Sequence, residues 1–360
     1  MKVAYFSNTD FSLYNFRLGL MKKMKEKGYT VYACASKGRH SEKLKEEFYF
    51  KHFPLKRSID LLGRDLLYFY RVYRFCKKEK PFLCHNFTIK PCIYATLAQK
   101  LAGVEKIYCT ITGVGSAFES KTTSKIVTFL YKRTLKHADK VIFQNADDMQ
   151  LFISLGIIKE GELIKGSGVD IEKFSPVEKR EGEVTVTLVA RMLYTKGVVE
   201  FVEAAKKIKN AKFLLVGPID KESPHRIREE QIEEWREYVD YLGEKDDIRE
   251  VLSLTDIFVL PSYYREGVPK VLLEAGAMGL PIITTDAPGC REVVEDKKTG
   301  FLIKSKDKED LIEKIKLLIE NRELRREFGK NFREKIERDF SEEMVVEKTI
   351  KCYHLDDEKR

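Results

Sequence analysis

Residues 256–275 read Asp256-Ile257-Phe258-Val259-Leu260-Pro261-Ser262 and then, after two tyrosines, Arg265-Glu266-Gly267-Val268-Pro269-Lys270-Val271-Leu272-Leu273-Glu274-Ala275. The apolar run predicts a buried strand, and Gly267 and Pro269 mark the turn from that strand into a helix. Two glutamates therefore lie eight residues apart in one unit, Glu266 in the loop and Glu274 inside the helix. Such strand, loop and helix units in succession predict an α/β fold.

A second unit of this kind occurs earlier, at Leu188-Val189-Ala190-Arg191-Met192-Leu193-Tyr194-Thr195-Lys196-Gly197. Arg191 and Lys196 fall on the loop after the strand, where a guanidinium and an ammonium together neutralise a diphosphate well. Helix N-terminal amides attract the same anion, and the two glutamates accept hydrogen bonds from hydroxyls on either side of it. This pattern favours a nucleotide sugar. The alternative is a set of solvated loop charges and an ordinary helical glutamate.

Strand-like and helical segments alternate along the whole chain, which predicts doubly wound parallel sheets. In the first half, helices are expected at residues 16–27, 65–79 and 94–102. The pattern restarts after Gly166-Ser167-Gly168-Val169-Asp170, so we expect two domains, residues 1–168 with 341–360 and residues 169–340. Two such domains facing each other would place a ligand cleft at the carboxyl ends of both sheets.

The composition limits the classes of protein that fit. Residues 1–168 carry 30 basic and 15 acidic side chains, a net charge of +15, whereas the remainder carries 36 and 42, a net charge of −6. A basic half indicates an anionic partner: nucleic acid, a membrane surface or a diphosphate-bearing substrate. The seven scattered cysteines argue against a disulfide framework and against structural zinc. The N-terminus leads directly into a strand, without a signal peptide, so we expect a cytoplasmic protein.

Several further motifs carry a resemblance to a known family. They are Phe213-Leu214-Leu215-Val216-Gly217-Pro218, Gly279-x-Pro281, Pro288-Gly289-Cys290-Arg291-Glu292-x-Val294, Lys90-Pro91 and Leu101-Ala102-Gly103-Val104. With the two units quoted above, in this order, the chain resembles the retaining GT-B glycosyltransferases of family 4. It is most similar to bacterial capsule, O-antigen and N-glycan assembly enzymes that act on polyprenyl-diphosphate-linked sugars. The resemblance implies a GT-B fold of two Rossmann-like domains, an N-terminal acceptor-binding domain and a C-terminal nucleotide-sugar-binding domain.

The resemblance also implies roles for residues of the second half. The catalytic residues would be Arg191, Lys196 and Glu266, of which the two cations hold the leaving diphosphate and Glu266 contacts the donor sugar. The donor nucleotide would be bound by Glu274 at the ribose, by amides near Gly267 and Val268 at the phosphate, and by a base pocket of Tyr241, Leu242 and Gly243. Such enzymes need no metal and no covalent cofactor, and we expect none here.

The first half departs from the family pattern. Many relatives carry His-Gly where this chain has Thr112-Gly113, which leaves recognition of the donor sugar open because threonine lacks the proton chemistry of an imidazole. Candidate acceptor-binding residues are Asn15, Arg17, Thr112, Gly113 and His85. For each of them an ordinary helix start, a tight turn or a local hydrogen-bonding group remains the alternative.

Residues 61–80 and 121–136 mix aromatic and basic side chains at helical spacing, which is typical of helices that lie on an anionic membrane. Together these features predict a UDP-sugar, with GDP as the alternative, as donor to a polyprenyl-diphosphate-linked glycan at the inner face of the cell membrane. A nucleotide-sugar epimerase, a catalytically inactive sugar-nucleotide binder and a basic nucleic-acid-binding protein are the competing hypotheses. A recognisable RNA-binding module is missing, which counts against the last of these.

Overall fold

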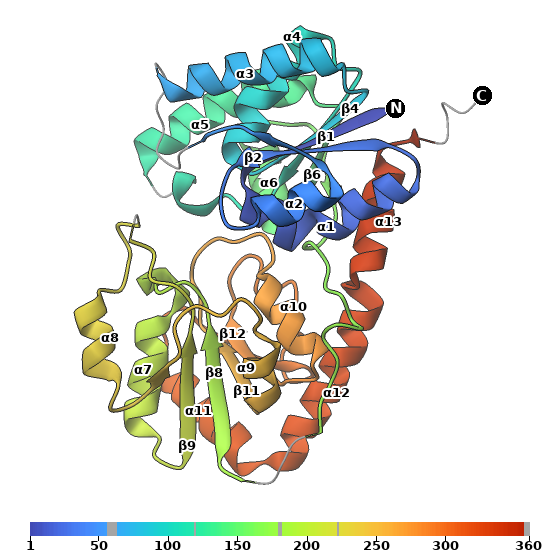
Figure 1. Cartoon of the computed structure of the whole chain (residues 1–360). Coiled ribbons are helices and arrows are strands. Elements are labelled where there is room, and N and C mark those ends of the chain that lie inside the picture. Colours follow the sequence, from blue (N-terminus) through green and yellow to red (C-terminus); the bar gives the residue numbers. More distant parts are fainter. Residues whose placement is uncertain (56–62, 119, 179–181, 222, 356–360) are drawn as a thin grey trace. The chain divides into compact units, whose positions relative to one another are not determined.

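The computed structural model describes residues 1–55, 63–118, 120–178, 182–221 and 223–355. The chain forms two compact units, each with its own sheet and helices (Figure 1). The first unit comprises Met1–Gly168 and the C-terminal segment that begins at Glu342, and the second unit comprises Val169–Ser341. The chain therefore returns to the first unit after completing the second.

The first unit contains a seven-stranded sheet in the order β3-β2-β1-β4-β5-β6-β7, and all of its paired strands are parallel. Its strands are β1 (Lys2–Thr9), β2 (Thr30–Ser36), β3 (Tyr49–His52), β4 (Leu83–Phe87), β5 (Lys106–Ile111), β6 (Lys140–Phe143) and β7 (Glu162–Leu163). Along β1, Val3 and Tyr5 pack on one face while Ala4 and Phe6 pack on the other. Because both faces are buried, the strands read as almost continuous apolar runs.

Helices cover both faces of this sheet (Figure 1). On one face lie α1 (Asp10–Glu26), α2 (Ser41–Glu47) and α13 (Glu342–Cys352). On the other lie α3 (Arg64–Glu79), the π-helix η1 (Pro91–Ala95), α4 (Thr96–Ala102), α5 (Lys121–Thr134) and the 3-10 helix η3 (Leu135–His137). Two further elements are η2 (Gly115–Phe118) and α6 (Ala146–Ser154), whose Phe152 packs with α5. Tyr353, just after α13, is fully buried among α1 and the sheet.

The second unit contains a six-stranded sheet in the order β10-β9-β8-β11-β12-β13, again with parallel pairing. Its strands are β8 (Val184–Val189), β9 (Ala211–Val216), β10 (Asp240–Tyr241), β11 (Ile257–Leu260), β12 (Ile282–Thr285) and β13 (Gly300–Ile303). One face packs against α7 (Val198–Lys207), α8 (Glu229–Trp235) and α11 (Lys308–Glu320), which form one apolar core with the strands. The other face packs against α9 (Arg249–Leu254), α10 (Lys270–Ala277) and α12 (Arg322–Asp339). The 3-10 helix η4 (Tyr194–Lys196) precedes α7.

Some boundaries differ from the predictions. The first helix begins at Asp10 rather than at residue 16, because the Thr9 hydroxyl accepts a hydrogen bond from the amide of Ser12 and caps the helix. Asn15, which precedes the predicted helix, therefore lies within α1, as Arg17 does. The helix predicted at residues 94–102 is preceded by a π-helical turn that begins at Pro91.

Helix α3 accounts for most of the predicted interfacial segment, of which residues 61 and 62 lie outside the described residues. Asp65 in its first turn forms a buried ion pair with Lys90 of the loop after β4, at 2.6 Å. This pair ties the start of α3 to the carboxyl end of the sheet. Across the described ranges, no helix is both long and apolar enough to cross a bilayer.

Candidate functional site

The second sheet reverses its strand order at the boundary between β8 and β11. From β8 the chain adds β9 and β10 on one side, and then crosses to add β11, β12 and β13 on the other. The carboxyl ends of two such adjacent parallel strands open a crevice where α/β proteins bind ligands. The loop with Arg191 and Lys196 follows β8, and the loop with Glu266 follows β11. The strand-end arrangement predicted from the sequence is therefore present.

Lys196 and Glu266 meet in an ion pair between these two loops. The side chains are only 9% and 18% exposed, so the pair is largely removed from water. The Ser262 hydroxyl donates a second hydrogen bond to the same carboxylate oxygen, at 3.2 Å. Gly197 lets the loops come this close, because at its φ of +74° a Cβ would collide with the carbonyl group of Pro261. The predicted catalytic residues Lys196 and Glu266 are thus in direct contact.

The carbonyl oxygen of Thr195 fastens the two loops together. It accepts hydrogen bonds from the amides of Tyr263 and Tyr264, at 3.0 and 3.1 Å, and from the Ser262 hydroxyl at 3.3 Å. The Lys196 ammonium also lies 5.6 Å from the centre of the Tyr264 ring, within range of a cation–π contact. These contacts fix the position of the lysine by both backbone and side chain.

Arg191 points to a different partner. Its Nη1 donates to the Asp220 carboxylate at 2.5 Å, and the Asp220 side chain is only 8% exposed. Asp220 follows the carboxyl end of β9, the neighbour of β8. Asp220 is not among the residues predicted for the site, although its place shortly after Val216-Gly217-Pro218 carries the same strand-end signal as Arg191. Both candidate cations of the second unit are therefore neutralised by carboxylates.

Gly267 and Val268 lie between Glu266 and the start of α10, and a neighbouring loop packs on them. Gly289, at a φ of +86°, sits where a Cβ would collide with the carbonyl group of Gly267 and lie 2.9 Å from the carbonyl oxygen of Glu266. Burial, and then the nearby Glu266 charge, raise the pKa of the adjacent Cys290 thiol to about 12. The Glu266 loop is therefore supported from the β12 side of the sheet as well as from β8.

Glu274 lies on α10, in a charge environment separate from the pair of Lys196 and Glu266. Burial raises its pKa above the usual value, and the charge of Asp247 acts in the same direction. Lys270 and Lys173 act against this shift without cancelling it. Hydrogen-bond donors on a ligand would stabilise the charged form of this buried carboxylate.

Tyr241, Leu242 and Gly243 lie at the end of the edge strand β10. The Tyr241 hydroxyl donates to the carbonyl oxygen of Gly217 at 2.8 Å, and the amide of Gly217 donates to the carbonyl oxygen of Gly243 at 2.8 Å. Burial raises the pKa of the Tyr241 phenol. Gly217 follows β9 directly, so these contacts join the carboxyl ends of β9 and β10. Leu242 remains 37% exposed beside them.

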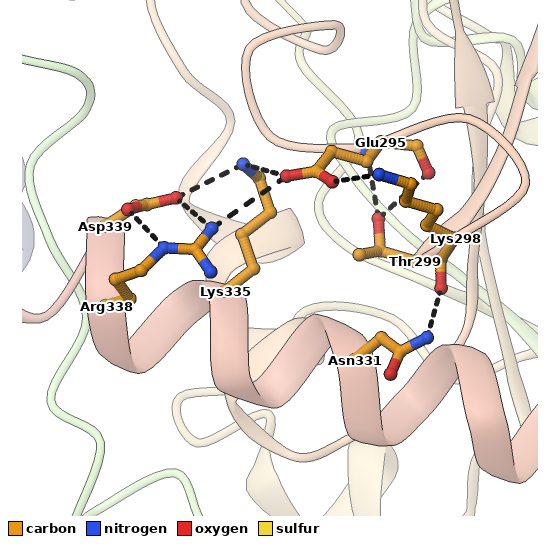
Figure 2. A network of polar contacts seen from close by, with 7 residues as sticks. All are labelled: Glu295, Lys298, Thr299, Asn331, Lys335, Arg338 and Asp339. Atoms are coloured by element: carbon orange, nitrogen blue, oxygen red, sulfur yellow. Dashed lines mark hydrogen bonds and ion pairs between the residues drawn. The ribbon is translucent and has the colours of Figure 1, made fainter.

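A polar network fixes the far end of the loop that supports Gly267 (Figure 2). Lys335 on α12 donates to Glu295 at 2.9 Å and contacts Asp339 at 3.3 Å, while Arg338 pairs with Asp339 at 2.9 Å. The hydrogen bond from Lys335, and then its charge, lower the pKa of Glu295. The backbone amide of Glu295 also donates a hydrogen bond to the Thr299 hydroxyl, at 2.9 Å. The network therefore ties the segment after Gly289 to a long helix.

The predicted acceptor residues of the first unit lie in different surroundings. Asn15 is on the second turn of α1 and donates to the carbonyl oxygen of Phe11 at 3.2 Å. Thr112 and Gly113 follow β5, and Gly113 has a φ of +110°, which suits the turn predicted there. Arg17 is buried on α1 and lies over the Phe87 ring, 4.3 Å from its centre. Thr112 and Gly113 thus sit at the carboxyl end of the sheet, whereas Arg17 packs against it.

His85 is fully buried and is hydrogen-bonded on both sides of its ring. Its Nδ1 lies 2.6 Å from the Tyr353 hydroxyl, and its Nε2 lies 2.7 Å from the Thr110 hydroxyl. Burial, and then the charge of Arg17, hold the pKa of His85 well below its usual value. In this arrangement His85 has no ring nitrogen left to contact a ligand, so we do not retain it as a direct acceptor-binding residue.

The chain matches known protein families along both units. Residues 170–335 match the family described as "Glycosyl transferases group 1", and residues 2–145 match the family described as "Glycosyl transferase 4-like". One relative is the N,N'-diacetylbacillosaminyl-diphospho-undecaprenol alpha-1,3-N-acetylgalactosaminyltransferase of Campylobacter jejuni, 30% identical with 98% of each chain covered. Another is the UDP-Gal:alpha-D-GlcNAc-diphosphoundecaprenol alpha-1,3-galactosyltransferase of Escherichia coli, 30% identical with 84% of this chain and 82% of the relative covered.

Solved structures share the fold. Anabaena HepE in complex with UDP and glucose has a TM-score of 0.82 at 17% identity, with 99% of this chain and 100% of that chain covered. Sucrose-phosphate synthase from Thermosynechococcus elongatus has a TM-score of 0.83 at 21% identity, with 98% of each chain covered. The two parallel sheets and these neighbours give the predicted GT-B class of two Rossmann-like domains. Because the matched families span most of the chain, and a relative at 30% identity matches almost its full length, the protein belongs to the group 1, family 4-like glycosyltransferases and is a glycosyltransferase.

Proposed function

We propose that the protein transfers a hexose or N-acetylhexosamine, with retention at the anomeric carbon, from a UDP-sugar to a polyprenyl-diphosphate-linked saccharide. Two relatives matched over most of their length are named for transfer of N-acetylgalactosamine or galactose to undecaprenyl-diphosphate-linked sugars. The observation that carries the proposal is the buried pair of Lys196 and Glu266, held where the order of the second sheet reverses. This is the position at which a nucleotide diphosphate binds in open parallel sheets.

The two cations of the second unit would act on the donor diphosphate. Lys196 and Arg191 are held by Glu266 and Asp220 respectively, and a bound diphosphate would compete with these carboxylates for them. Negative charge grows on the diphosphate as it leaves the sugar, so the same contacts strengthen in the transition state. Glu266, released from Lys196, would accept hydrogen bonds from hydroxyls of the donor sugar.

The nucleotide would extend from this point toward α10 and β10. The amides near Gly267 and Val268 lead into the N-terminus of α10, whose dipole favours a phosphate. Glu274 would accept hydrogen bonds from the ribose hydroxyls, which offset the burial of its charge. The base would lie along Tyr241, Leu242 and Gly243, whose backbone groups are already ordered by contacts with Gly217.

The first unit would bind the acceptor. Asn15, Thr112 and Gly113 lie on α1 and after β5, and they remain our candidates for contacts with the acceptor saccharide. Because Thr112 offers a hydroxyl and no imidazole, it would contribute a hydrogen bond and no proton transfer. The phosphate of the departing donor would then accept the proton of the attacking hydroxyl.

The first unit would also contact the inner face of the cell membrane. Helix α3 exposes Leu66, Leu67 and Tyr70, at 60%, 47% and 52%, beside an exposed basic set of Arg71, Arg74, Lys77 and Lys78. Helix α5, on the same face of the sheet, exposes Phe129 at 56% among Lys125, Lys132 and Arg133 (Figure 1). Aromatic and aliphatic side chains combined with basic ones bind anionic lipid surfaces. Such binding would bring the enzyme to a lipid-linked acceptor.

The test is a transfer assay with purified protein. UDP-galactose, UDP-N-acetylgalactosamine, UDP-glucose, UDP-N-acetylglucosamine and the GDP-sugars are offered with a short-chain polyprenyl-diphosphate N-acetylhexosamine, and the product is followed by mass spectrometry. We expect one UDP-sugar to give a product one sugar heavier, with an α linkage in its NMR spectrum. An altered sugar left on the nucleotide, with no product one sugar heavier, would instead support the epimerase alternative.

A further inference from the structure

Arg17 is a buried cation that no carboxylate of the described residues neutralises. It belongs to the third turn of α1 and is 7% exposed. In the described part of the chain, no carboxylate pairs with its guanidinium, and its Nε has no hydrogen-bond partner. Burial lowers its pKa to about 10 against an opposing effect of Tyr353, and its guanidinium lies 4.3 Å from the centre of the Phe87 ring. A charge taken out of water in this way is expensive unless something compensates it.

Arg17 is one of the residues that line a small cavity. It holds about 10 Å³, room for one water-sized atom, and it is not closed off from solvent. Its polar lining comes from Arg17, His85, Thr110 and Thr349, and apolar side chains complete it. The Thr349 hydroxyl is already engaged, because it donates to the carbonyl oxygen of Val345 at 2.8 Å. Among these side chains, Arg17 and Thr110 are therefore the ones with a donor group left for an atom in the cavity.

The Thr110 hydroxyl is set by a buried relay from the C-terminal segment. The His85 ring is neutral at neutral pH, so one of its nitrogens donates and the other accepts. When the Tyr353 hydroxyl donates to Nδ1, Nε2 donates to the Thr110 oxygen, and the Thr110 proton is free to point into the cavity. The Tyr353 carbonyl oxygen is itself held by the Tyr108 hydroxyl at 3.0 Å. The chain thus returns from the second unit to complete this arrangement.

We propose that the cavity beside Arg17 is an oxyanion site that takes one phosphoryl oxygen of the acceptor diphosphate. Arg17 and Thr110 donate to that oxygen, and His85 and Tyr353 act as positioning residues. The cavity has room for one oxygen, so the rest of the diphosphate stays outside it. The cavity therefore does not select the lipid or the saccharide of the acceptor. The diphosphate source rests on the proposed function, whereas the oxyanion site stands on the geometry of Arg17 alone.

The main test replaces Arg17 by methionine, which keeps the length of the side chain and removes the charge. Acceptor kinetics are measured on the full-length protein with the short-chain polyprenyl-diphosphate saccharide. We expect the R17M variant to raise the acceptor KM at least tenfold, while UDP binding stays within twofold of wild type. Its Tm should stay the same or rise, because an uncompensated buried charge has been removed. Lys23→Met is the matched control, since it removes an exposed charge from the same helix.

Free anions provide the second arm of the test. Inorganic pyrophosphate and phosphate are titrated calorimetrically into an Arg191→Ala, Lys196→Ala background, which removes the cations of the second unit. Pyrophosphate binding that disappears on adding Arg17→Met supports the oxyanion site. Thr110→Val should weaken it severalfold and Thr110→Ser should restore it, and Tyr353→Phe should weaken it without changing the charge of the site.

The outcomes separate the two proposals. If Arg17→Met lowers the Tm and leaves pyrophosphate affinity and acceptor KM unchanged, Arg17 is a structural cation and the site is overturned. If pyrophosphate binding depends on Arg17 but the acceptor KM does not, the cavity binds a free anion and the acceptor assignment is overturned. If wild type binds pyrophosphate through Arg17 but transfers no sugar to any polyprenyl diphosphate, the proposed function fails and the oxyanion site stands.

Discussion

The candidate cations of the two units are handled in opposite ways. In the second unit, Lys196 and Arg191 each hold a carboxylate, Glu266 and Asp220. In the first unit, Arg17 is buried and no carboxylate within the described ranges pairs with it. A cation that is paired with a carboxylate keeps its position when the site is empty, but it must leave that carboxylate to bind a diphosphate. A buried cation without such a partner destabilises the empty fold, and an anion that binds to it removes this cost. The difference suggests that the cations of the second unit exchange partners in each turnover, whereas Arg17 of the first unit gains a partner only when an anion binds.

The largest effect should come from breaking the buried pair of the second unit. Lys196→Ala is expected to lower kcat about 100- to 1,000-fold, the range seen when one donor to a developing negative charge is lost. UDP affinity should fall less, because Arg191 remains. Initial rates of UDP release measure the first effect, and calorimetry measures the second. Lys207→Ala, which removes an exposed ion pair with Glu309, is the control and should leave both unchanged. Equal losses in UDP affinity and kcat would show that Lys196 binds the ground state as strongly as the transition state.

Glu274 gives the next effect, confined to binding. Glu274→Gln is expected to weaken UDP binding about tenfold or more, since hydrogen bonds to a charged acceptor contribute about 1.5–3 kcal/mol. Its raised pKa adds a pH signature: protonation removes the acceptor, so wild-type UDP affinity should begin to fall above the usual pKa of a glutamate as the solution is acidified. The variant should lose that fall. Glu313→Gln, on the surface of α11, is the control, and identical pH profiles for wild type and E274Q would contradict the assignment.

These residues also show what the sequence could predict. The positions of Lys196 and Glu266 follow from two apolar runs that end in polar loops, because parallel strands bring their carboxyl ends to one edge. The start of α1 was readable too, since Thr9 and Asp10 are a typical N-cap and first turn, yet the prediction began the helix six residues late. The local sequence pattern is sufficient to place a residue when its position depends on a single strand, loop and helix unit.

Partners from distant elements could not be predicted in this way. His85 and Tyr353 are 268 residues apart, and no periodicity links the strand β4 to the residue after the last helix. From the sequence, His85 at a strand end was open to two interpretations, a ligand contact or a local hydrogen-bonding group, and only the fold shows that both of its ring nitrogens have partners. Asp220 was missed for a related reason: the pattern placed Arg191 in a loop, but only the tertiary fold shows which carboxylate it meets.

A smaller effect is expected from a substitution of Asp220 that frees Arg191 from its carboxylate partner. Asp220→Asn removes the charge that competes with a diphosphate, and we expect UDP to bind about threefold more tightly, a change below 1 kcal/mol. Fluorescence or calorimetric titration measures it, and Asp240→Asn, which removes an exposed partner of Lys212 in the same unit, is the control. Weaker binding would mean that Asp220 positions Arg191 rather than competing for it.

The stability of the first unit should depend on pH because His85 is buried in it. The folded pKa of His85 lies well below its usual value, so between about pH 6.5 and that lower value the unfolded chain binds more protons. The contribution of His85 to the free energy of unfolding is therefore fully present above about pH 6.5. It falls as the pH is lowered through this window, by at most about 1.4 kcal/mol per pH unit. Hydrogen exchange of β4 peptides, corrected for intrinsic rates, reports the first unit, while the single tryptophan, Trp235, reports the second. His85→Gln should flatten the dependence and the exposed His225→Gln should not. A wild-type profile flat from pH 7 to 5 would mean that the imidazole can be protonated in the fold.

The smallest effect is expected at the network in Figure 2. Glu295→Gln removes one charge from a group that is 41% exposed, and Lys335 and Arg338 keep Asp339 as partner. Partly exposed ion pairs contribute about 1 kcal/mol or less, so the Tm should drop by only a few degrees. The informative quantity is kcat, because the network acts on the Glu266 loop only through the segment around Gly289. If kcat is unchanged while Gly289→Ala, which pushes directly on Gly267, lowers it at least tenfold, close backbone packing positions the site and the surface charges do not. Gly28→Ala is the matched control, since its φ of +87° carries the same backbone strain with open space around it.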